Sequence, residues 1–158
     1  MPRHQIWFMD TLVDVNLEGA DTGGAYAVVT FTSPSGHMPP PHVHANEAEG
    51  LLVHEGELTL HTAAGVHVLR PGDAVHAPRG EPHTVEVTSP GPARYTVIFA
   101  PAGFVDFVCA FGVPAERPEL PVLDGPPDFE RLARIAAEHG ITFVGPPGTR
   151  PVDLDTSP

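Results

Sequence analysis

The first hundred residues of the chain consist largely of short segments in which apolar side chains alternate with polar ones. A period of two is typical of β-strands that bury one face, and Gly- and Pro-rich turns separate these segments. We expect strands at residues 5–9, 11–16 and 25–32, several between 41 and 88 including 66–69, and one at 93–99, with a turn at 21–24. Many short strands at this spacing predict an all-β fold, a single antiparallel jelly-roll β-barrel.

The pattern changes after Pro101. Phe104, Phe107, Val108 and Phe111 occupy positions i, i+3, i+4 and i+7, which form one apolar stripe on a helix. We therefore expect a short helix to follow the last strand of the barrel.

A Pro-rich link at 114–127 precedes a second helical pattern, for which Asp128 is placed as N-cap and Gly140 as the stop. The last residues are rich in Pro and Gly, which favours disorder. The expected organisation is a barrel with its following short helix at 1–112, the link and a C-terminal helix packed on the barrel at 113–144, and a flexible tail at 145–158.

Two groups of histidines and glycines stand at fixed offsets in the barrel region. The first is Gly36-x5-His42-x-His44-x4-Glu49-x6-Gly56, and the second is Gly72-x5-Pro78-x-Gly80-x2-His83. On a strand, side chains two residues apart point to the same face, so both rings of His-x-His point one way. The prolines before His42 favour an extended chain there.

Glu49 begins the next apolar run and His83 begins another, so three strands can direct four side chains at one point. Three imidazoles and a carboxylate suit one divalent transition ion, such as Fe, Ni, Mn, Co or Zn, and leave coordination positions open for chemistry. The expected metal ligands are His42, His44, Glu49 and His83.

These two motifs resemble those of the cupin superfamily, and the 15 residues between them match the spacing of small microbial cupins. One departure is Val87, where the family often has an Asn that is not normally a ligand. The segments 21–24 and 101–104, with the helix that follows, are similar to single-domain cupins described as quercetin-dioxygenase-like. The resemblance implies a metal-dependent oxidoreductase, a dioxygenase acting on an aromatic or enolic small molecule such as a flavonol or polyketide.

Other activities stay open, because this fold hosts many chemistries. In a dioxygenase, Glu49 could serve as the catalytic base toward a bound phenol or enol. In a non-redox isomerase, cyclase or decarboxylase of natural-product biosynthesis, the ion would stabilise an enolate as a Lewis acid. A third interpretation is a cupin that binds a small molecule without turning it over.

Candidates for a substrate pocket inside the barrel are Tyr26, Phe31 and Met38, although large side chains of this kind more often fill a core. Alternation places His54 on the face opposite Glu49, and Glu47 is expected in solvent. The remaining histidines are expected on the surface or the outer face: His4, His37, His61, His67, His76 and His139.

The composition narrows the class of partner. The chain has 158 residues and a net charge of −12, which argues against nucleic acid and leaves a small molecule as the expected partner. We find no apolar run of about twenty residues that could span a membrane and no signal-peptide pattern. Cys109 is the only cysteine, which fits a cytoplasmic protein. Exposed sheet edges and the apolar segment Ile6–Met9 predict a homodimer.

Overall fold

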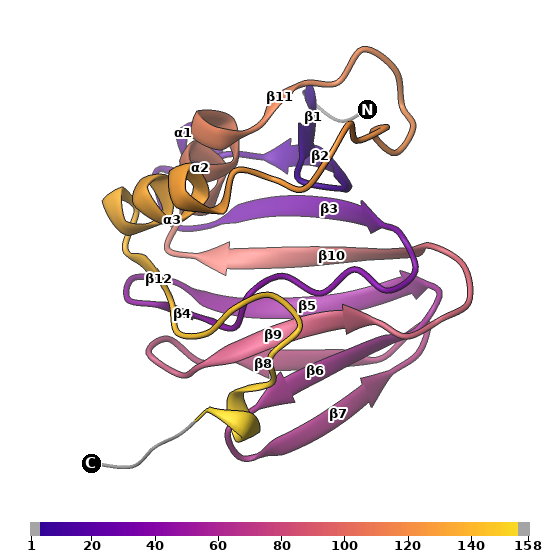
Figure 1. Ribbon diagram of the computed structural model, residues 1–158. Helices are drawn as coiled ribbons and strands as arrows, with labels where there is room; N and C mark the ends of the chain where they lie inside the picture. Colours follow the sequence, from indigo (N-terminus) through magenta and orange to yellow (C-terminus); the bar gives the residue numbers. More distant parts are fainter. Residues whose placement is uncertain (1–3, 155–158) are drawn as a thin grey trace.

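Residues 4–154 are described in the structure, a computed structural model, and their strands form two antiparallel sheets (Figure 1). The larger sheet has the order β11-β1-β2-β3-β10-β5-β8, and the smaller has the order β12-β4-β9-β6-β7. Strands distant in sequence lie side by side, as β3 does with β10, so the predicted all-β jelly roll is confirmed.

The bounds agree with the alternating segments of the sequence. The larger sheet contains β1 (His4–Phe8), β2 (Thr11–Leu17), β3 (Ala27–Ser33), β5 (Ala48–Glu55), β8 (Ala74–Ala77), β10 (Ala93–Ala100) and β11 (Val113–Pro114). The smaller sheet contains β4 (His42–His44), β6 (Leu58–Thr62), β7 (Gly65–Leu69), β9 (His83–Val87) and β12 (Ile141–Phe143).

The register between β5 and β10 determines what faces the interior. Alternate residues of β10 are buried, from Ala93 through Tyr95 to Phe99, while the residues between them point outward. Phe99 lies opposite Glu49 in this register. A carboxylate is therefore carried into the core by a strand whose other inward residues, Leu51 among them, are apolar.

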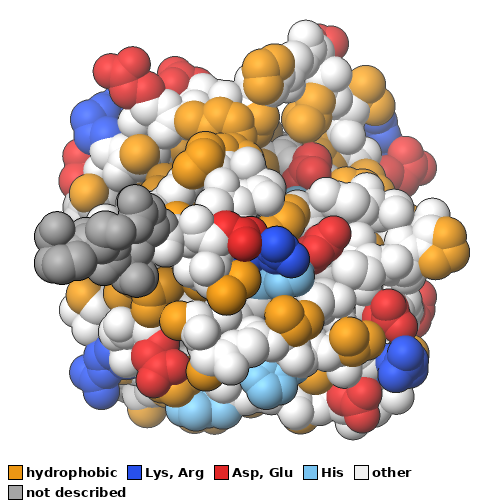
Figure 2. Space-filling view, turned by 60° about the horizontal axis from the view of Figure 1, so that its bottom comes forward, with side chains coloured by type: hydrophobic (Ala, Val, Ile, Leu, Met, Phe, Trp, Pro, Cys, Tyr) orange, Lys and Arg blue, Asp and Glu red, His pale blue; other side chains and the backbone are white. Residues whose placement is uncertain are grey.

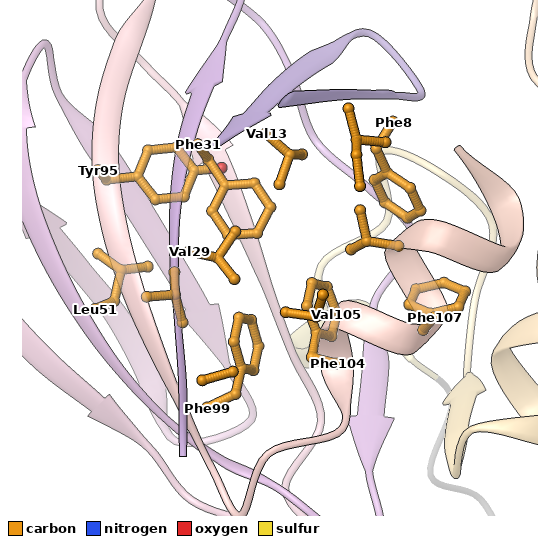
Figure 3. Packing of buried hydrophobic residues seen from close by; sticks show 14 of the residues in the cluster. Phe8, Val13, Val29, Phe31, Leu51, Tyr95, Phe99, Phe104, Val105 and Phe107 are labelled. Atoms are coloured by element: carbon orange, nitrogen blue, oxygen red, sulfur yellow. The ribbon is translucent and has the colours of Figure 1, made fainter. Parts of the chain in front are cut away.

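The helix α2 (Phe104–Phe111) contacts β1 and β3 of the larger sheet and confirms the predicted amphipathic helix. Phe104 stacks on Phe99 with ring centroids 4.0 Å apart, and Phe107 meets Phe8 edge to face at 5.3 Å (Figure 3). Offset-stacked and edge-to-face pairs each add about 0.5–1.5 kcal/mol beyond the burial of area. The aromatic stripe thus fixes the helix against the barrel core.

The helix α3 (Phe129–Glu138) contacts α2, and Asp128 caps it by accepting a hydrogen bond from the Arg131 backbone N–H at 2.9 Å. The predicted cap is confirmed. After Gly140 the chain returns to the barrel as β12, which pairs with β4. None of the helices within residues 4–154 is long and apolar enough to cross a membrane.

Three local features differ from the expectations. A four-residue helix, α1 (Gly19–Thr22), precedes two glycines with positive φ in the expected turn. The strand β11, within the expected link, pairs with β1, and its Pro114 is tolerated because β11 lies at the edge of the sheet.

The third difference lies in the expected flexible tail. Residues 145–154 include the 3₁₀ helix η1 (Pro151–Asp153), which contacts β6 through the buried Pro151. Residues 155–158 of that segment lie outside the described residues. Figure 2 views this face, on which acidic, basic and histidine side chains adjoin near the centre. Arg150 pairs with Asp153 at 2.6 Å within the segment itself, and the buried Pro151 holds the segment to the barrel.

Candidate metal centre

Both sheets contribute to the cluster of histidines and glutamate. His42 and His44 lie on β4, and His83 begins β9 directly opposite His42. Glu49 comes from β5 in the larger sheet. One ligand atom from each of these residues lies within 4.8 Å of those from the others, so the four groups could hold a metal ion.

Each imidazole is oriented from behind by a hydrogen bond to its Nδ1. The carbonyl of Pro40 accepts from His42 at 2.8 Å, and the carbonyl of Glu81 accepts from His83 at 3.0 Å. A carbonyl can only accept, so in both rings the proton sits on Nδ1 and the lone pair of Nε2 faces the cluster. This is the tautomer in which a histidine binds a metal.

The inward nitrogens of His44 and His83 are buried and have no hydrogen-bond partner among the described residues. Each lies close to Glu49 Oε1, His44 Nε2 at 2.7 Å and His83 Nε2 at 3.4 Å, but without hydrogen-bond angles. Buried polar atoms normally have partners. Two unpartnered nitrogens converging on a carboxylate are a donor set that fits a cation.

The electrostatics of the metal-free chain also favour a positive charge here. Burial lowers the pKa of His44, but the contact with the Glu47 carboxylate and the negative charges of Glu47 and Glu49 outweigh it and raise that pKa to about 9. Burial and the neighbouring imidazoles lower the pKa of His42 to about 3. Burial opposes ionisation of Glu49, yet His44 and His83 hold its pKa well below the usual range. A proton and a metal ion would compete for the same nitrogen of His44.

A cavity that is partly open to solvent extends from the cluster into the barrel. Its walls are mainly apolar and come from both sheets and from α2 and α3: Phe31, Leu51, Phe99, Phe104, Leu132 and Phe143. A concave, apolar site with a few convergent polar groups is typical of small-molecule binding.

Of the three predicted pocket residues, the structure places only Phe31 in this cavity. Tyr26 directly precedes β3 and is 41% exposed, and the residues before it from Gly23 onward are also exposed. Met38 lines a separate depression beside the Pro39–Pro40 segment. The pocket assignment is therefore corrected for Tyr26 and Met38.

The sequence interpretation missed Glu47, which was expected in solvent. It is only 3% exposed, and its carboxylate lies 3.3 Å from Nδ1 of His44. The signal was present, because Glu47, Glu49 and Leu51 are spaced by two and share the inward face. Glu47 thus orients the third imidazole as the carbonyls orient the other two.

Two further histidines expected on the surface are buried. His37 pairs with Asp10 at 2.6 Å, and His61 pairs with Glu86 at 2.8 Å. The carboxylate pairs with one nitrogen of each ring, while His61 Nδ1 has no partner among the described residues. Pattern alone does not reveal such buried pairs. His54 is exposed on the outer face as expected, where its Nε2 contacts the Thr96 hydroxyl at 2.7 Å.

Comparison with known proteins agrees with this architecture. The family model of the cupin domain matches residues 29–99, and the chain belongs to the cupin superfamily. It is similar to a quercetin 2,3-dioxygenase from Bacillus subtilis, 33% identical over 131 residues. That match covers 82% of this chain but 39% of the dioxygenase, so the chain spans well under half of that relative's length.

Solved structures resemble the fold. A sugar phosphate isomerase of the cupin superfamily from Silicibacter pomeroyi aligns with a TM-score of 0.50 and 25% identity, covering 60% of this chain and 61% of that one. A predicted oxalate decarboxylase from Thermotoga maritima aligns with a TM-score of 0.56 and 18% identity, covering 62% and 93%. The second likeness concerns the fold alone.

Proposed function

We propose that the chain is a metal-dependent dioxygenase that acts on an aromatic or enolic small molecule. One observation carries the proposal: three imidazoles and the Glu49 carboxylate converge at one end of a cavity whose walls are mainly aromatic and aliphatic. The similarity to a quercetin 2,3-dioxygenase supports the choice of reaction.

His42, His44, Glu49 and His83 would hold one divalent ion in this proposal. When bound, the ion supplies a Lewis acid with open coordination positions, which lowers the pKa of a coordinated hydroxyl and, if it is redox-active, supports oxygen chemistry. The chain itself supplies shape and proton transfer. The apolar walls hold an aromatic ring and exclude water. In this proposal the buried Glu49 carboxylate accepts the proton that a phenol or enol loses.

Metal analysis combined with oxygen uptake tests the proposal. The purified protein should contain about one divalent ion per chain, and a panel of flavonols and phenolic polyketides should include a compound that drives oxygen consumption. The variant His44→Ala should lose both. The matched control is His67→Ala, which removes an exposed histidine of β7 and should keep both.

The alternatives give different results in the same assay. Conversion of a compound without oxygen uptake, equally fast without air, would replace the dioxygenase by a non-redox isomerase, cyclase or decarboxylase. Saturable binding with no conversion of any compound would leave a small-molecule-binding cupin. A His44→Ala variant that keeps its full metal content would contradict the ligand set itself.

A further inference from the structure

A chain of hydrogen-bonded side chains leads along the cavity wall to a buried tyrosine. The Tyr95 hydroxyl lies 3.1 Å from Ser33 Oγ, and Ser33 Oγ lies 3.0 Å from Thr11 Oγ1. The Thr11 hydroxyl donates to Asp10 Oδ1 at 3.4 Å, and the same oxygen lies 2.6 Å from His37 Nδ1. Among these, Tyr95, Thr11 and His37 line the cavity.

The carboxylate at the end of this chain determines the direction of every hydrogen bond in it. Burial opposes ionisation of Asp10, but the hydrogen bond and charge of His37 outweigh it and lower the pKa, so Asp10 is ionised and can only accept. Thr11 uses its single hydrogen on Asp10 and must accept from Ser33. Ser33 in turn must accept from Tyr95. The Tyr95 hydrogen is thereby committed, and its oxygen keeps a free lone pair.

Tyr95 lies well away from the metal ligands along the strand. It precedes Phe99, the partner of Glu49, by four residues, so the Cα atoms of Tyr95 and Phe99 are about 13 Å apart at the usual rise of a strand. The wall between them is apolar, from Leu51 and Val97 to Phe99. The cavity therefore has two polar ends, a cluster of metal-binding groups at one and an oriented acceptor at the other.

We propose that Tyr95 accepts a hydrogen bond from a hydroxyl group at the end of the substrate remote from its metal-binding oxygens. The ligand class is an aromatic enol or phenol with a second, distal hydroxyl. Tyr95 acts as a specificity-determining residue, and Ser33, Thr11 and Asp10 position it by holding its hydrogen. The assignment rests on the proposed function in one respect, that the enol end binds at the histidine cluster.

The test measures binding to the full chain loaded with Zn²⁺, which is redox-silent, so that turnover plays no part. Fluorescence titration gives dissociation constants for two probes, 3-hydroxyflavone with a 4′-hydroxyl and the same compound with a 4′-methoxy group. The wild-type chain should favour the hydroxyl probe by about fivefold to tenfold, since a neutral hydrogen bond contributes about 1 kcal/mol.

Three variants separate an oriented acceptor from mere fit. Tyr95→Phe should bring the ratio of the two constants close to one. Thr11→Val keeps Tyr95 but removes the hydroxyl that accepts from Ser33. The Ser33 and Tyr95 hydroxyls can then donate in either direction, so the ratio of the two constants should fall to an intermediate value. Thr96→Val is the matched control, because Thr96 lies on the same strand and points to the opposite face; its ratio should equal that of the wild type.

The proposal is overturned by any of three results: no preference in the wild type, a preference retained in Tyr95→Phe, or no saturable binding of either probe. Thr11→Val with an unchanged ratio overturns the oriented chain. The proposed dioxygenase activity is tested separately. If the wild type prefers the hydroxyl probe but the iron-loaded protein consumes no oxygen, the role of Tyr95 stands and the dioxygenase activity is rejected.

Discussion

Glu47 shows how a single buried carboxylate can set the properties of a site without entering it. It contacts the outer nitrogen of His44, and Gly103 leaves room for it, since a Cβ at that glycine would lie 2.7 Å from Glu47 Oε1. A carboxylate in this position makes the imidazole a stronger donor and fixes its ring. His44 is therefore held between two glutamates, one behind it and one beside the metal position.

Glu47→Gln should weaken metal binding while leaving the four proposed ligands in place. The amide can still accept from Nδ1 but brings no charge, so the affinity should fall about 10–100-fold, the usual effect of losing such a partner. Competition with a metal-sensitive chelator dye measures it. The control Glu116→Gln removes an equally negative but exposed group and should leave the affinity unchanged. Equal affinity in both variants would show that Glu47 plays no part in orienting His44.

The depressed pKa of Asp10 predicts that the free energy of unfolding depends on pH. Burial opposes ionisation of Asp10, but His37 outweighs it and lowers the pKa of this carboxyl below the usual 3.8. A carboxyl whose pKa is depressed by folding contributes stability above its unfolded pKa and loses that contribution as pH falls through the folded value. Asp10→Asn should therefore be less stable than the wild type at pH 6, and the difference should shrink below pH 4.

Urea denaturation at pH 6, 4 and 3 gives the free energy of unfolding of both proteins. In this pH range Asp10 binds more protons in the unfolded wild type than in the folded one. Its contribution to the free energy of unfolding therefore rises with pH. A gap between wild type and variant that widens as the pH falls would contradict the depressed pKa of Asp10.

At the scale of elements, Gly56 connects β5 to β6, and both its backbone conformation and its close approach to a neighbouring strand favour glycine there. Its φ is +79°, which favours glycine, and a Cβ there would lie 2.8 Å from Ala93 Cα. The turn that ends the first motif is thus pressed against the start of β10. Gly36 has nearly the same φ of +78° but open space where its Cβ would be.

Comparing alanine substitutions at these two glycines separates the energetic cost of backbone strain from that of a steric clash. Gly36→Ala should cost about 1–2 kcal/mol through the left-handed conformation alone, whereas Gly56→Ala should lose a further 1–3 kcal/mol or so because the neighbouring backbone must shift. Chemical denaturation of both variants measures the difference. Equal losses would show that β10 adjusts to the added methyl group without strain.

The elements that sequence predicted are those whose signal is local. The alternation in β10 and the helical stripe of α2 are each contained in a few residues, and both were placed nearly to the residue. The short strands β11 and β12 form by pairing with strands distant in sequence, β11 with β1 and β12 with β4. Nothing in Val113–Pro114 by itself indicates a strand, since its stability lies in the pairing.

The same distinction applies to the site. The spacing of His42, His44, Glu49 and His83 carried enough information to bring them together, because strand geometry converts sequence spacing into direction. The Tyr95–Asp10 chain could not be found in that way. Its members come from β10, from β3, from the first residue of β2 and from the turn before it, and only the assembled sheet brings their hydroxyls into contact.

At the scale of the molecule, the family model matches residues 29–99, but the cavity is completed by residues outside that range. Phe8 and Thr11 come before it, and Phe104, Leu132 and Phe143 come after it. The matched region therefore supplies the proposed ligands, while much of the wall that would select a substrate belongs to the flanking elements. Proteins that share the matched region can therefore share a metal site and still bind different substrates.

The expected homodimer remains a prediction, but its contact surface must be relocated. Ile6 and Phe8 are buried within their own barrel, and β11 covers the edge of β1, so the N-terminal segment is already used. The outer face of the larger sheet is a better candidate. Leu52 is 40% exposed and Ile98 46% exposed, on adjacent strands that pair with each other.

A second copy of this chain is the occupant that we expect there. With a net charge of −12, two copies repel each other over most of their surfaces. Around Leu52 and Ile98, the outer face of β10 and β5 carries Thr96 and Gly50, and the negative charge of Glu55 lies opposite the positive charge of Arg94, so contact at this face adds little net negative charge. A self-complementary patch of this kind suits the two-fold symmetry of most homodimers.

Leu52→Glu combined with Ile98→Glu should convert a dimer to a monomer, since each copy would then place two carboxylates in an apolar contact without partners. Light scattering at micromolar concentration measures the mass, and circular dichroism verifies that the barrel is intact. Val122→Glu alters a residue that is 81% exposed on the link and should leave the dimer unchanged. A monomeric wild type would reject the dimer, whereas a folded double variant that stays dimeric would reject this face, leaving the edge strands β7 and β8 as the contact to examine.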